Sequence, residues 1–239
     1  MRTLGLSLTL AISLCAGMSA FSQSASPMAD EANPPTSNPA WKAPEVIAFI
    51  GLKKGDKVAD VVAGRLTPSL AQAVGPSGKV YAIETAEVAK AHPESLARMK
   101  ALAARLPNVI VSEEPIASAL PTGLDAVLIR QNYHDLYDKF MGPADVAAFN
   151  KSVFAALKPG GVYVVLDHAA KAGSGISATE TLHRIDPARV KTDVLAAGFK
   201  LDAESSIFAN KDDDHTKTVF DPSVRFHTDQ FLFRFKKPN

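Results

Sequence analysis

The sequence contains a single cysteine, Cys15, and it lies within the first 22 residues. This segment has one arginine, an apolar run from Leu4 to about Ala16 and then small residues, which is typical of a secretory signal peptide. With cleavage after Ser22, the mature chain would have no cysteine. Disulfides, thiolate nucleophiles and cysteine-bound metals are then excluded. The apolar run is short for a membrane span, so an uncleaved anchor is the less favoured alternative.

An excess of charge is also lacking, because 26 Lys and Arg residues stand against 25 Asp and Glu residues. No basic stripe is visible, and nucleic acid is therefore not expected as a partner. The sequence also lacks a Gly-x-Ser-x-Gly elbow and a phosphate-binding loop with lysine, which argues against a hydrolase triad and a nucleotide-triphosphate site. A small-molecule substrate is the expected partner, and the oligomeric state is not indicated.

Composition divides the chain into three parts. Residues 1–22 are the predicted signal peptide, and residues 23–40 are rich in Pro, Ser, Ala and Asn, which is typical of a flexible linker. Residues 41–239 form the predicted folded domain. We therefore expect an exported protein, located in the periplasm, with no stable membrane insertion after signal cleavage.

From Trp41 onward, strand-like and helix-like segments alternate, which predicts an α/β fold with a parallel sheet covered on both faces. Helices are expected at 43–52, 67–75, 93–107, 143–157 and 186–199. Strands are expected at 57–63, 79–84, 108–114, 124–131, 161–168, 200–209 and 229–237. The last two strands have no crossover helix between them and should pair antiparallel. The prediction is a doubly wound, mostly parallel seven-stranded sheet with an antiparallel C-terminal hairpin.

In open sheets of this kind, ligands bind beyond the carboxyl ends of the parallel strands. Polar or glycine-containing segments follow four of the predicted strands here: 60–64, Glu84, 131–135 and the pair Asp167-His168. These four strand ends are therefore the candidate site.

Four motifs in order resemble the class I S-adenosylmethionine (SAM)-dependent methyltransferase family, in an exported bacterial branch. They are WKAPEV at 41–46, LKKGDKVAD at 52–60, GPSGKVYAIE at 75–84 and LKPGG at 157–161. The resemblance implies a Rossmann-like methyltransferase fold, SAM as cofactor and methyl transfer to a small-molecule acceptor. It also implies that Glu84 binds the ribose hydroxyls, that Asp60 and Gly64 contact the methionine part, and that Asn132 lies beside the reactive methyl group.

The loop after the first strand departs from the family pattern, which has glycines at every second position. Val62 occupies the first glycine place, and the loop after Gly64 is shorter by about two residues. A shortened, glycine-poor loop predicts impaired cofactor binding. The alternative is an exported, non-catalytic binding protein whose cavity is filled by Val62, Arg65 or Leu66.

His134 and Asp135 follow the fourth strand, and His134 is the candidate general base because imidazole titrates near neutrality. A capping role for both residues is the open alternative. Tyr133, Asp167, His168 and His183 are expected to line the cleft and shape acceptor specificity. No pair among the histidines and Asp167 has a metal-ligand spacing, so no metal is expected. Reuse of the cleft for other chemistry, through His134, Asp167 and His168, remains a third possibility.

Overall fold

The computed structural model describes residues 39–239. The predicted signal peptide at 1–22 lies outside the described residues, as does the predicted linker at 23–40 except for its last two positions. Those two, Pro39 and Ala40, belong to a short 3-10 helix, η2 (Pro39–Trp41). No helix in the described range combines the length and the apolar character that crossing a membrane requires.

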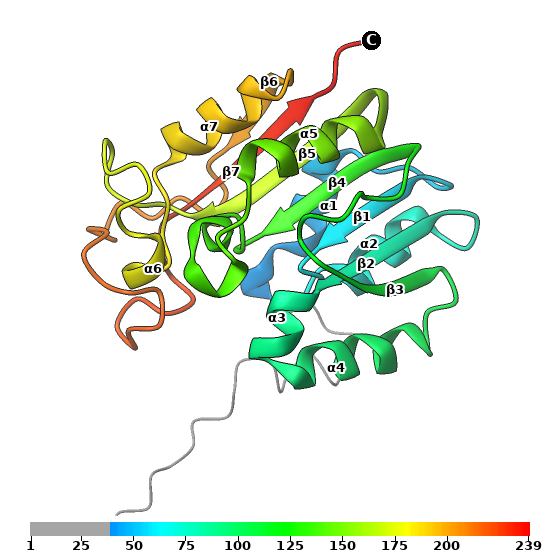
Figure 1. Cartoon of the computed structure of the whole chain (residues 1–239), viewed down its shortest axis with the longest axis horizontal. Helices are drawn as coiled ribbons and strands as arrows, with labels where there is room; N and C mark the ends of the chain where they lie inside the picture. Colours follow the sequence, from blue (N-terminus) through cyan, green and yellow to red (C-terminus); the bar gives the residue numbers. More distant parts are fainter. Residues whose placement is uncertain (1–38) are drawn as a thin grey trace, which may run out of the picture.

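Seven strands form one sheet in the order β3-β2-β1-β4-β5-β7-β6 (Figure 1). Their bounds are β1 (Lys57–Val61), β2 (Lys79–Thr85), β3 (Val109–Glu114), β4 (Leu124–Arg130), β5 (Leu157–His168), β6 (Lys200–Ser205) and β7 (Gln230–Lys236). The first five strands pair in parallel, whereas β7 pairs antiparallel with both β5 and β6. The predicted fold class, including the antiparallel C-terminal strands, is confirmed.

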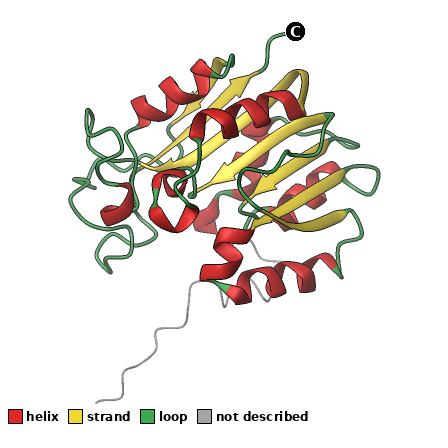
Figure 2. Cartoon of the chain, viewed as in Figure 1, coloured by secondary structure: helices red, strands yellow, loops and turns green. Residues whose placement is uncertain are grey.

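Helices cover both faces of the sheet (Figure 2). Helices α1 (Ala43–Ile50), α2 (Thr67–Val74) and α4 (Pro93–Ala103) pack on one face. Helices α3 (Ala86–Ala91), α5 (Val146–Ala156) and α7 (Pro187–Ala196) pack on the other. Successive residues of β4 alternate between the two cores: Ala126 and Leu128 face one, and Val127 and Ile129 face the other. A strand buried on both faces reads as a continuous apolar run, as this one does.

Three of the differences between the observed elements and the sequence expectation have a clear cause or size. Helix α3 was not predicted; Thr85 starts it by accepting a hydrogen bond from the Val88 amide at 3.2 Å. Strand β5 begins at Leu157 and not at the predicted 161, because Leu157 already pairs with Leu124 before a register shift. Strand β6 ends at Ser205, short of the predicted 209.

The long connection between β5 and β7 contains α6 (Thr179–Leu182), α7 and β6, and is otherwise mostly loop (Figure 2). Much of it gathers at the end of the sheet to which β4 and β5 point (Figure 1). The fully buried Arg184 anchors it by pairing with Asp213 at 2.9 Å and donating to the carbonyl oxygens of Ala169 and Lys217. Asp213 is therefore buried, although it lies within a run of three aspartates, at 212–214.

Candidate active site

A cavity of about 520 Å³ lies at the carboxyl ends of the parallel strands. This volume is in the range of small-molecule sites. Eight of the ten side chains singled out from the sequence line it: Asp60, Gly64, Glu84, Asn132, His134, Asp135, His168 and His183. The fold thus brings together residues from four strand ends and from the β5–β7 connection.

Glu84 forms one end of the cavity. It closes β2 just before the Thr85 cap, and only 1% of its surface is exposed. Burial raises the pKa of Glu84, and the neighbouring Ser95 hydroxyl, the Thr85 backbone and the charge of Arg98 offset this only in part. Its Oε1 atom has no hydrogen-bond partner within the described residues. A buried carboxylate oxygen without a partner, on a residue that lines a cavity, is available to accept hydrogen bonds from a ligand.

The loop between β1 and α2 is braced by Asp60. Its Oδ2 atom accepts a hydrogen bond from the Thr67 hydroxyl at 2.6 Å and a longer one from the Gly64 amide at 3.5 Å. Thr67 is the first residue of α2, and Leu66 is the N-cap of this helix. Because Asp60 draws both ends of the loop together, the loop turns tightly despite having a single glycine.

Val62 keeps a backbone conformation that glycine normally adopts, with φ at 53°. A β-branched residue in this left-handed region is an outlier and costs about 1–3 kcal/mol. Gln131 and His183 also have positive φ values and line the same cavity. Strain of this kind concentrates at functional sites.

The side chains of the loop do not fill the cavity. Gly64 and Glu84 line one continuous hollow, and Val62, Arg65 and Leu66 form part of its wall. Leu66 packs into the core as well, and the Arg65 guanidinium lies 5.4 Å from the centre of the Trp41 ring. The loop closure that the non-catalytic alternative requires is therefore not what the structure has.

Replacing Val62 by glycine tests whether this strain is real. Relief of the left-handed strain should offset the lost packing and the added chain entropy, so the free energy of unfolding should stay within about 1 kcal/mol of wild type. The matched control is Val61→Gly, because Val61 is a buried residue of β1. That variant should lose about 2–4 kcal/mol in urea denaturation. A loss at Val62 as large as at Val61 would contradict the strain argument.

His134 is held at the start of η3 (His134–Tyr137) by Asp167, which closes β5. Its amide donates to Asp167 Oδ2 at 2.8 Å, and its ring Nδ1 lies 2.9 Å from Asp167 Oδ1. On the other side of the ring, Nε2 lies 3.1 Å from Asp135 Oδ1. Asn132 in turn donates to Asp135 Oδ2 at 2.7 Å. Both nitrogens of this buried imidazole are thus in contact with a carboxylate, and these contacts fix the direction of the ring.

These contacts favour the open alternative, a structural role for His134, over that of a general base. Burial lowers its pKa, but the carboxylates of Asp167 and Asp135 outweigh burial and raise the pKa well above the usual histidine value. Because both ring nitrogens contact carboxylates, His134 could take a proton from an acceptor only after losing one of these contacts.

Two further expectations are wrong. Tyr133 does not line the cleft: it is fully buried in the core, and its hydroxyl accepts a hydrogen bond from Asn150 at 2.8 Å. Asp167 does not line the cleft either, because it lies behind His134 and also accepts from the His168 amide at 2.7 Å. Tyr133 and Asp167 do lie at polar strand ends, as predicted. The direction of each side chain depends on packing that the sequence pattern does not reveal.

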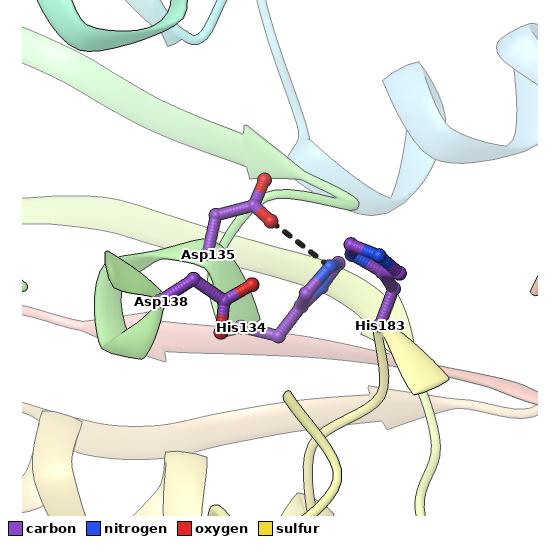
Figure 3. A group of neighbouring side chains, drawn as sticks. All are labelled: His134, Asp135, Asp138 and His183. Atoms are coloured by element: carbon purple, nitrogen blue, oxygen red, sulfur yellow. Dashed lines mark ion pairs between the residues drawn. The ribbon is translucent and has the colours of Figure 1, made fainter. Parts of the chain in front are cut away.

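The structure adds residues that the sequence reasoning missed. Asp138 joins His134, Asp135 and His183 in one cluster (Figure 3). Its spacing from His134 in HDLYD is i, i+4, which would have been a usable signal. Phe220 and Arg225 also line the cavity, from the β5–β7 connection. No local pattern marks them.

Comparison with known proteins gives a consistent picture of the architecture. No protein-family model and no curated protein matches the sequence. A SAM-dependent methyltransferase from Aquifex aeolicus is similar in structure, with 20% identity, a TM-score of 0.58 and coverage of 88% of this chain and 93% of that chain. The glycopeptide N-methyltransferase MtfA, complexed with sinefungin, has 14% identity, a TM-score of 0.59 and coverage of 85% and 88%.

A third similar structure is the cyclase SpnF, with 17% identity, a TM-score of 0.60 and coverage of 83% of this chain and 80% of that chain. One fold can thus carry different activities, and at these identities the likeness concerns the fold alone. The chain has the fold of the SAM-dependent methyltransferases.

Proposed function

We propose that this protein is a SAM-dependent methyltransferase that acts on a small-molecule acceptor. The observation that carries the proposal is the buried, unpaired Oε1 of Glu84 at the wall of a cavity that also reaches Gly64. In dinucleotide-binding folds of related architecture, an acidic residue at a strand end accepts hydrogen bonds from ribose hydroxyls. Glu84 ends the second strand and has the free acceptor capacity for that task.

The residues present are suitable for the cofactor. Glu84 would hold the ribose, and the short loop after β1 would hold the methionine part through the Gly64 backbone, with Asp60 keeping that loop in place. When bound, SAM supplies an electrophilic methyl group on a sulfonium centre. Val62 lines this end of the cavity, where the family pattern has a glycine. We therefore propose binding that is weaker than a glycine-rich loop would give.

The acceptor would occupy the part of the cavity near His134, His168 and His183. Phe140 and Phe220, both partly exposed, also line the cavity and offer apolar surface to a small molecule. This chain would contribute positioning and exclusion of water, which are the main protein contributions to a direct group transfer. His134, with both ring nitrogens in contact with carboxylates, would keep this wall of the cavity in place and would not remove a proton.

Titration calorimetry with S-adenosylhomocysteine and SAM tests the proposal on the full chain. One binding site per chain is the expected result, with the product at least as tightly bound as the cofactor. Absence of heat at millimolar ligand, in a sample shown to be folded by circular dichroism, would reject the proposal and favour a non-catalytic binding protein on this fold.

A further inference from the structure

We propose that His134, Asp135, Asp138 and His183 bind a zinc ion at the wall of the cavity. One ligand atom from each of these residues lies within 4.8 Å of those of the other three (Figure 3). They come from η3, from the residue after it and from the end of α6. The proposal goes beyond the proposed function and does not rest on it, because it concerns the chain without any cofactor.

His134 has the orientation of a metal ligand. Asp167 contacts Nδ1 at 2.9 Å and the backbone amide at 2.8 Å, which leaves Nε2 as the ligand atom. A carboxylate on the far nitrogen of a ligating histidine fixes the tautomer and the ring direction. Asp135 has equivalent support, since Asn132 holds Oδ2 and leaves Oδ1 on the side of Nε2.

Asp138 supplies an independent observation. Only 2% of its surface is exposed, and its Oδ1 has no hydrogen-bond partner among the described residues. Figure 3 shows its carboxylate turned toward the His134 ring. A buried carboxylate oxygen without a partner is costly unless a cation or donor satisfies it.

The burial of the carboxylates also favours a cation. Asp135, Asp138 and Asp167 are all buried close to the imidazole of His134. Buried charges are normally paired or bound to metals.

The donor atoms select the kind of ion. Two imidazole nitrogens and two carboxylate oxygens suit zinc, which binds both at about 2.0–2.2 Å in tetrahedral geometry. Magnesium and calcium prefer oxygen ligands only. Tetrahedral bonds of this length put the donors about 3.3–3.6 Å apart, so the cluster closes on the ion by small side-chain rotations.

The ion would face the cavity. His134, Asp135 and His183 line it, and Asp138 is in contact range of them without lining it. His183, with φ at 54°, is held in a left-handed conformation that turns the chain at the end of α6. A zinc ion here would border the space assigned to the acceptor.

Equilibrium dialysis of the full chain against Zn²⁺, after removal of metals with a chelator, tests the proposal without S-adenosylhomocysteine. One zinc per chain is expected, and Mg²⁺ at the same concentration should not compete. Asp138→Asn and His183→Ala should each weaken zinc binding by about tenfold or more. If zinc binds but the cofactor titration shows no heat, the proposed function fails and this proposal stands. If the cofactor binds but zinc does not, this proposal fails and the proposed function stands.

His92→Ala is the matched control, because His92 is exposed and lines the same cavity near Glu84, outside the cluster. It should bind zinc as wild type does. His183 is only partly buried, so its variant gives the test should Asp138→Asn fail to fold. Binding well below one zinc per chain, unchanged binding in His183→Ala, or an equal loss in His92→Ala would overturn the proposal.

Discussion

Glu84→Gln is expected to weaken binding of S-adenosylhomocysteine by about tenfold to a hundredfold. Glutamine keeps the size of the side chain but loses the charge that strengthens hydrogen bonds from hydroxyl groups, each worth about 1.5–3 kcal/mol. The amide of glutamine also has one acceptor oxygen, whereas the carboxylate has two. The ionised carboxylate of Glu84 destabilises the folded chain without ligand, because it is buried, and this burial raises its pKa. The variant should therefore fold at least as stably as wild type while binding the ligand less well, as measured by calorimetry.

Glu94→Gln is the control for this substitution. Glu94 also lines the cavity, but it is exposed and makes only a loose ion pair with Arg98 at 3.7 Å. The same chemical change there should alter affinity less than about threefold, because a surface pair contributes little. Equal losses in the two variants would indicate a general charge effect and contradict the role of Glu84.

Asp167→Ala is expected to destabilise the fold by about 3–5 kcal/mol, the range for removing one partner of a buried ion pair. The fully buried Asp167 accepts from the amides of His134 and His168 and contacts the His134 ring. Its removal leaves the two amides without their acceptor and the imidazole of His134 without its main charge partner. Urea denaturation followed by circular dichroism measures the loss.

Glu204→Ala provides the comparison, since Glu204 forms a partly exposed ion pair with Lys191 at 2.7 Å. Pairs of this type are worth less than about 1 kcal/mol. A change at Asp167 no larger than at Glu204 would show that the buried contacts do not hold the site together.

The architecture was predictable from the sequence because its signals are periodic and local. Apolar runs such as LDAVLIR can be buried only in the middle of a sheet, and TPSLAQAVG carries a proline near its start and a glycine at its end. The missing crossover helix before the last strand predicted its antiparallel pairing. Helix α3 escaped notice because it has only six residues and too short an apolar pattern.

The site was only partly predictable, for a different physical reason. Strand ends identify which segments meet at the cavity, and this placed Glu84, Gly64 and His134 correctly on its wall. The direction of each side chain depends on neighbours distant in sequence. Asn150 draws Tyr133 into the core, and His134 covers Asp167. The contributions of Phe220 and Arg225 depend on how the β5–β7 connection folds back, which Arg184 and Asp213 decide over long range.

A crystal structure of the chain grown with S-adenosylhomocysteine tests the central claim most directly. The account predicts density for the ribose within hydrogen-bond distance of the Glu84 carboxylate and the amino-acid end of the ligand at the loop around Gly64. Ligand density elsewhere on the chain, or a loop at 62–66 that occupies the space beside Glu84, would contradict it.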